Sequence, residues 1–72
     1  MKITLYKGLT CPKCKIVAMK LDAVGIKYEI VTDPDYMLSI GVTTIPTLEV
    51  DGKRYVDVKE CRDWIHSIEG QL

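Results

Sequence analysis

The stretch KITLYKGLTCPKCKIVAMKLDAV, residues 2–24, decides the fold. Apolar and polar side chains alternate over residues 2–6, which predicts a short strand. Residues 8–12 break this pattern, and Pro12 suits the first turn of a helix, where its missing N–H costs nothing. Apolar residues then recur at helical spacing, so an amphipathic helix is expected over residues 14–24.

A second strand and a second helix are expected next. Apolar side chains alternate with charged ones over residues 26–30, which predicts a strand. Strand, helix and strand joined by tight connections favour a right-handed unit with parallel strands. Residues 33–35 read Asp-Pro-Asp, a turn and helix-cap signal, so a short helix is expected over residues 36–40.

The C-terminal third predicts a hairpin followed by a helix. Asp51-Gly52 lies between the β-prone runs 47–50 and 53–56, and Asp-Gly in this setting is a strong hairpin signal. Asp57 is expected to cap the last helix, with Glu60 completing a capping box. Its apolar stripe consists of Cys61, Trp64, Ile65 and Ile68. The order βαβαββα predicts an α/β fold, a mixed four-stranded sheet flanked by helices, in a single domain over residues 1–72.

Composition and charge exclude several classes of function. The chain has 72 residues, 47% of them hydrophobic, which indicates a folded globule. Ten basic residues balance ten acidic ones, so a general nucleic-acid binder is not expected. No apolar run approaches the about 20 residues of a membrane span, and no signal-peptide stretch is found. Three cysteines are too few, and odd in number, for a disulfide scaffold. We therefore expect a cytoplasmic monomer.

The pair Cys11-Pro12-Lys13-Cys14 carries the chemistry. Its first sulfur is expected beside the unpaired N–H groups and the positive end of a helix, which favour a thiolate and lower its pKa. Lys7, Lys13 and Lys15 add positive charge nearby. One helical turn separates the two sulfurs, so they can close a disulfide. We expect Cys11 to be exposed and to attack, and Cys14 to be shielded and to resolve the mixed disulfide.

Two other interpretations of the pair remain open. The same spacing occurs in zinc sites, with Cys61 and His66 as the remaining candidate ligands. These two residues do not share a helix face, and Cys61 is expected to be a buried small hydrophobe. A small zinc-binding interaction module is thus the alternative, and a redox-inert adaptor is a third. No metal is assigned. Tyr6, at the end of the first strand, is either a functional or a core residue.

The sequence resembles the glutaredoxin branch of the thioredoxin superfamily. The resemblance rests on Tyr6 ending the first strand, on Thr10-Cys11-Pro12-Lys13-Cys14, on Ile45-Pro46 and on the Asp51-Gly52 hairpin. It spans nearly the whole chain, and its most specific element is a Cys-x-x-Cys followed some 30–35 residues later by Ile-Pro. It implies a minimal thioredoxin fold and a thiol–disulfide oxidoreductase.

The resemblance also implies site residues and partners. The Ile45–Pro46 bond would be cis, and Thr10, Pro12, Lys13, Ile45 and Pro46 would contact the substrate. That substrate would be a protein disulfide or a glutathione mixed disulfide. Small redoxins of this size serve ribonucleotide reductase, which is one candidate partner. No bound cofactor is implied; glutathione or thioredoxin reductase would supply electrons. The glutathione-binding Gly-Gly pair of glutaredoxins is absent from the corresponding stretch, residues 55–60, where Asp57 or Glu60 would supply the charge.

Overall fold

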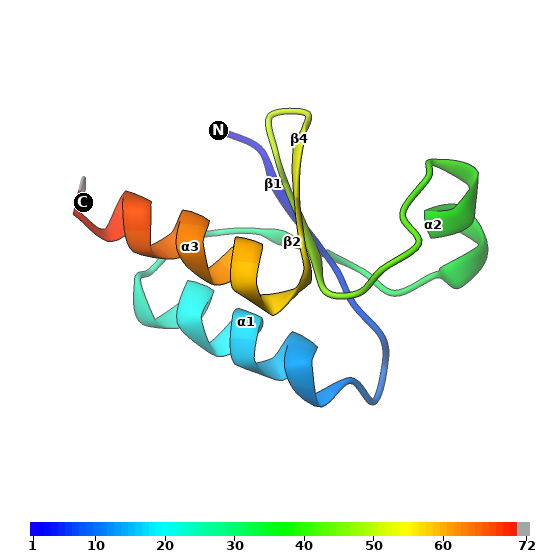
Figure 1. Ribbon diagram of the computed structural model, residues 1–72, viewed down its shortest axis with the longest axis horizontal. Helices are drawn as coiled ribbons and strands as arrows, with labels where there is room; N and C mark the ends of the chain where they lie inside the picture. Colours follow the sequence, from blue (N-terminus) through cyan, green and yellow to red (C-terminus); the bar gives the residue numbers. More distant parts are fainter. Residues whose placement is uncertain (71–72) are drawn as a thin grey trace.

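A mixed four-stranded sheet forms the centre of the molecule in the computed structural model, which describes residues 1–70 (Figure 1). The strands are β1 (Ile3–Tyr6), β2 (Glu29–Val31), β3 (Thr47–Val50) and β4 (Lys53–Val56). They are ordered β2-β1-β3-β4, with β2 parallel to β1 and the other neighbours antiparallel. The predicted α/β class, the element order and the mixed sheet are confirmed.

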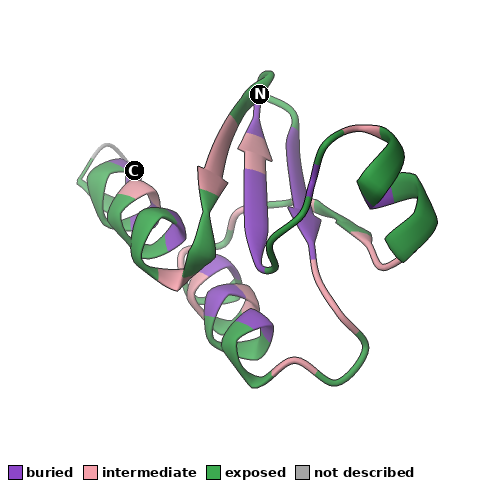
Figure 2. Ribbon diagram, turned by 45° about the vertical axis from the view of Figure 1, so that its right-hand side comes forward, coloured by how far each residue is buried: buried purple, intermediate pink, exposed green. Residues whose placement is uncertain are grey.

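Three helices flank the sheet. They are α1 (Pro12–Ala23), α2 (Pro34–Ser39) and α3 (Asp57–Glu69). Helices α1 and α3 lie side by side along one face, whereas α2 lies on the opposite side of the sheet (Figures 1 and 2). None of the helices described within residues 1–70 is long and apolar enough to cross a membrane.

The core follows the alternation of the two central strands. One face of β1 and β3 packs on α1 and α3, in a cluster formed by Ile3, Leu5, Val17, Leu21, Leu48, Val50, Cys61 and Ile65. Tyr6 faces the other way and packs with Met37 and Val42 beneath α2. All four residues of β1 are therefore buried, as expected for a strand covered on both faces. Tyr6 is a core residue.

The second strand begins later than its sequence pattern suggested. The prediction of a strand over residues 26–30 is wrong in its bounds, because β1 pairs with β2 only from Glu29 onward. Ile26 and Tyr28 still pack against the main core, but they do so before the ladder starts. Ile30 lies opposite Leu5 and yet is 52% exposed. As an edge strand, β2 has a neighbour on one side alone, so its length depends on β1 rather than on its own pattern.

The start of α3 differs from the predicted capping box. Glu60 does reach back, but its Oε1 accepts the N–H of Val56 at 3.0 Å rather than that of Asp57. Asp57 itself has a φ of 66°, and its Oδ1 accepts the N–H of the adjacent Val58 at 2.8 Å. Its own N–H donates to the carbonyl of Pro46 at 2.9 Å. Asp57, the first residue of α3, therefore lies in the left-handed region and ties this helix to the loop before β3.

Substitutions of Asp57 should separate the effect of this backbone conformation from that of the side chain. Asp57→Val and Asp57→Gly both lose the bond to the Val58 N–H, but glycine alone tolerates a φ of 66° without strain. We expect Asp57→Val to lower the free energy of unfolding by about 1–3 kcal/mol more than Asp57→Gly does. Urea titration of both variants measures this difference. Equal losses would contradict it.

Candidate active site

Cys11 lies at the junction where β1 gives way to α1. It is the N-cap of α1, in an extended conformation, and Pro12 occupies the first helical turn as expected. The Cys11 Sγ accepts the N–H of Cys14 at 3.2 Å, so the sulfur takes the place of the usual capping oxygen. Because Cys11 is half-buried and free, its sulfur is held at the helix end and remains open to a substrate.

Several donors around Cys11 favour its thiolate. A hydrogen bond with the Cys14 side chain is the main cause that lowers the pKa of Cys11. Burial, the second largest cause, opposes this lowering, whereas the backbone N–H groups of Cys14 and Lys13 and the charge of Lys13 add to it. Of the three lysines considered, Lys13 acts on Cys11, whereas Lys7 acts to lower the pKa of Cys14.

Cys14 is the opposite kind of thiol. It is fully buried on the inner face of α1. Burial and the hydrogen bond that its thiol makes with Cys11 raise its pKa from 9.0 to about 11, although the Gly8 backbone opposes the shift. The site thus contains an accessible sulfur that favours the thiolate beside a shielded sulfur that keeps its proton.

The loop before β3 lies next to this pair. The Ile45–Pro46 bond is cis, Pro46 is fully buried, and Ile45 is 38% exposed. A Cβ placed on Gly8 would lie 2.9 Å from the Ile45 Cδ1 and 3.6 Å from the Cys11 Cβ. Gly8 therefore leaves the space that lets Ile45 approach the loop of Cys11. Thr10, Pro12 and Lys13 are exposed around the same loop.

The remaining candidate ligands for a metal differ in their surroundings. Cys61 is fully buried, its thiol donates to the carbonyl of Tyr55 at 3.3 Å, and burial raises its pKa to about 11. His66 is exposed on α3. Across residues 1–70, no three His, Cys, Asp or Glu side chains gather where they could hold a metal ion.

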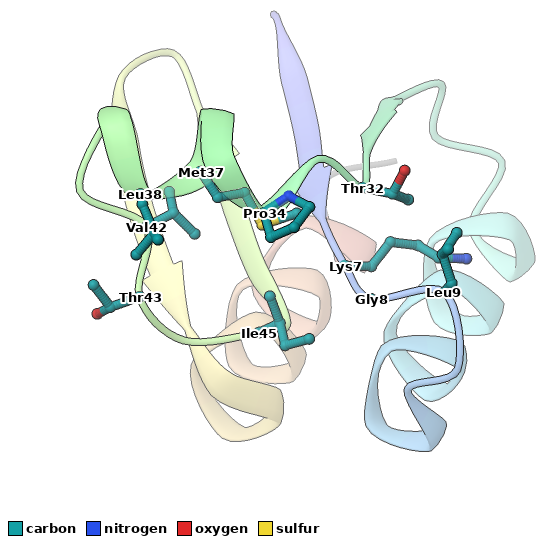
Figure 3. Close-up of a pocket in the computed structure, with 10 residues that line it drawn as sticks. All are labelled: Lys7, Gly8, Leu9, Thr32, Pro34, Met37, Leu38, Val42, Thr43 and Ile45. Carbon is teal, nitrogen blue, oxygen red and sulfur yellow. The ribbon is translucent and has the colours of Figure 1, made fainter.

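A cavity of about 410 Å³ adjoins the Cys11 loop, and sequence reasoning did not anticipate it. Figure 3 shows Gly8 and Leu9 on one side of it, and α2 with the following loop as far as Ile45 on the other. The lining residues are Lys7, Gly8, Leu9, Thr32, Pro34, Met37, Leu38, Val42, Thr43 and Ile45. They come from segments far apart in the sequence, so no local pattern marks them as a group.

Comparison with known proteins identifies the architecture. A scan of protein-family models finds no match to this sequence, and a search of curated proteins finds none. Among solved structures, the fold is similar to that of a buckwheat glutaredoxin crystallised as a complex with glutathione. The TM-score is 0.74 over 93% of this chain and 70% of that chain, with 16% sequence identity. The chain has a glutaredoxin-like fold. The resemblance to the thioredoxin superfamily is thus confirmed for the fold, while the roles of the site residues remain predictions.

Proposed function

We propose that this protein is a thiol–disulfide oxidoreductase that uses Cys11 and Cys14 as its redox pair. The observation that carries the proposal is the contrast between the two thiols. Cys11 is accessible and its pKa is lowered, whereas Cys14 is buried and its pKa is raised to about 11. A sulfur that attacks must be ionised and reachable, and a sulfur that resolves must wait until the first step is complete.

The proposed reaction has two exchange steps. The Cys11 thiolate attacks one sulfur of the substrate disulfide, a mixed disulfide forms at Cys11, and the other substrate sulfur leaves as a thiolate that takes up a proton. Cys14 then loses its proton and attacks the Cys11 Sγ, which forms the Cys11–Cys14 disulfide and releases the second substrate thiol. Two electrons pass to the substrate, and a thiol or a flavin-dependent reductase returns them.

The Cys14–Cys11 contact supports the second step. In the reduced protein the thiol of Cys14 hydrogen-bonds the Cys11 sulfur, which holds its proton in place. Once Cys11 is in a mixed disulfide, its negative charge is gone, and so is the hydrogen bond that favoured the protonated form of Cys14. The pKa of Cys14 should then fall, although burial, the larger cause of its rise, still acts on it, so resolution follows attack.

The substrate is proposed to be a protein disulfide or a glutathione mixed disulfide, with Thr10, Pro12, Lys13, Ile45 and Pro46 around it. Ile45 supports this assignment, because its Cδ1 lies beside Gly8, next to Cys11. No bound cofactor is needed, and glutathione or thioredoxin reductase remains the proposed electron source. A cytosolic location suits a pair that must be kept reduced.

The proposed activity can be tested by the reduction of insulin with dithiothreitol. We expect the protein to accelerate precipitation of the freed insulin B chain well above the rate with dithiothreitol alone. Bis(2-hydroxyethyl) disulfide, assayed with glutathione and its reductase or with thioredoxin reductase, identifies the electron source. If neither disulfide is reduced faster than in the absence of protein, the proposal is wrong. Measuring the zinc content of the same preparation tests the alternative of a zinc module.

A further inference from the structure

We infer that the cavity beside Cys11 binds a large apolar side chain that lies next to the attacked cysteine in a protein substrate. The inference rests on the proposed function and names the substrate class of that same site. It concerns the wall formed by Leu9 of the β1–α1 loop, Leu38 of α2 and Ile45 before β3, which is hereafter called the apolar wall.

The cavity adjoins the loop that holds the reactive sulfur. Gly8 lines it, and a Cβ at Gly8 would lie within 3.6 Å of the Cys11 Cβ. Ile45 lines the cavity too, and its side chain lies next to Gly8 (Figure 3). A chain whose sulfur is bonded to Cys11 therefore places its neighbouring side chains at the mouth of this cavity.

The chemistry of the apolar wall favours an apolar group. Leu9 is 82% exposed, Leu38 is 64% exposed, and Ile45 is 38% exposed. Met37 and Val42 form the buried floor, where they pack with Tyr6. Covering such surface with another apolar side chain removes it from water, which is favourable. Exposed leucines on two separate segments that face one cavity are typical of a binding site.

The charges around the cavity indicate which substrate segments it favours. Lys7 is the charged residue among those that line the cavity, all of which belong to the described residues 1–70. Lys13 is exposed beside Cys11, and the first turn of α1 has no acidic residue. A substrate segment with a carboxylate close to its cysteine is therefore favoured over a basic one.

These features distinguish a protein segment from glutathione alone. Glutathione consists of γ-glutamate, cysteine and glycine, so it has carboxylates but no apolar side chain to fill the cavity. A peptide such as Glu-Leu-Cys-Leu has both the apolar side chains and the carboxylate. We therefore expect peptide disulfides of this kind to be better substrates than small disulfides of equal reactivity.

The test compares three symmetric peptide disulfides with cores Glu-Leu-Cys-Leu, Glu-Ala-Cys-Ala and Lys-Leu-Cys-Leu, alongside bis(2-hydroxyethyl) disulfide. The wild-type protein should show a kcat/KM for the Glu-Leu peptide about tenfold above that for the Glu-Ala peptide, as an apolar contact in a pocket supplies. The kcat/KM for the Lys-Leu peptide should lie between these two values.

Leu38→Ser and Leu9→Ser should each remove most of the preference for leucine over alanine. Both residues are exposed enough to be replaced without loss of the fold.

Met19→Ser is the matched control, because Met19 is 69% exposed on α1 and does not line this cavity. It should change every kcat/KM by less than about twofold, since it removes no group that binds the substrate.

Equal rates for the leucine and alanine peptides, or a preference that survives both leucine substitutions, would overturn the inference. Bis(2-hydroxyethyl) disulfide is too small to use the apolar wall. If it is reduced while the peptides show no preference, the proposed function stands and the inference fails; if no disulfide is reduced, the proposed function itself fails.

Discussion

A Cys11→Ser variant is expected to lose disulfide reductase activity by on the order of 10³-fold or more, because the attacking atom is gone. Cys14→Ser should behave differently. Its Cys11 can still attack, but no second sulfur resolves the product, so a mixed disulfide accumulates at Cys11. The difference follows from the structure, in which Cys11 is accessible and Cys14 is fully buried.

Mass spectrometry of each variant after incubation with glutathione disulfide reads out this difference. Cys14→Ser should gain the mass of one glutathione on the peptide that contains Cys11, and Cys11→Ser should gain none there. Cys61→Ser is the matched control, since it replaces a buried cysteine that lies in the main core and should leave a functional redox pair. A stable adduct on Cys14 in the Cys11→Ser variant would reverse the assigned roles.

Features set by neighbouring residues could be predicted from the sequence. The Asp51-Gly52 turn forms as expected, with φ values of 49° and 88°, because this dipeptide supplies the required backbone conformation by itself. The cap of α2 by Asp33 and the position of Pro12 in the first turn of α1 have equally local causes. The same holds for the placement of Cys11 at a helix end.

Features set by distant segments could not be predicted. The start of β2 depends on its pairing with β1, and the positive φ of Asp57 depends on how α3 joins the Pro46 carbonyl. The apolar wall brings together Leu9, Leu38 and Ile45, whose spacing in the sequence follows no helical or strand period. Even at the redox pair, the helix end and the lysines are evident in the sequence, whereas the Cys14 side chain has the largest effect on the pKa of Cys11.

Selective alkylation should reveal the difference between the three thiols. Iodoacetamide reacts with thiolates, so its rate follows the ionised fraction of each sulfur and its access to solvent. With a pKa of about 11, Cys14 is ionised to only about 10⁻⁴ at pH 7, whereas a thiol at the ordinary 9.0 is ionised to about 10⁻². Cys61 has the same raised pKa of about 11 and is equally buried. Both should react at least about 100-fold more slowly than an ordinary thiol.

Cys11 should react faster than an ordinary thiol at pH 7, and the midpoint of its rate profile should lie below pH 9.0, because its pKa is lowered from that value. Peptide mapping after short exposure to iodoacetamide between pH 5 and 10 gives the three profiles separately. In concentrated urea the differences should vanish, since unfolding removes both the donors around Cys11 and the burial of the other two. A folded-state profile for Cys11 with its midpoint at or above pH 9.0 would mean that the Cys14 thiol and the backbone donors do not stabilise its thiolate, and the division of roles within the pair would lose its physical basis.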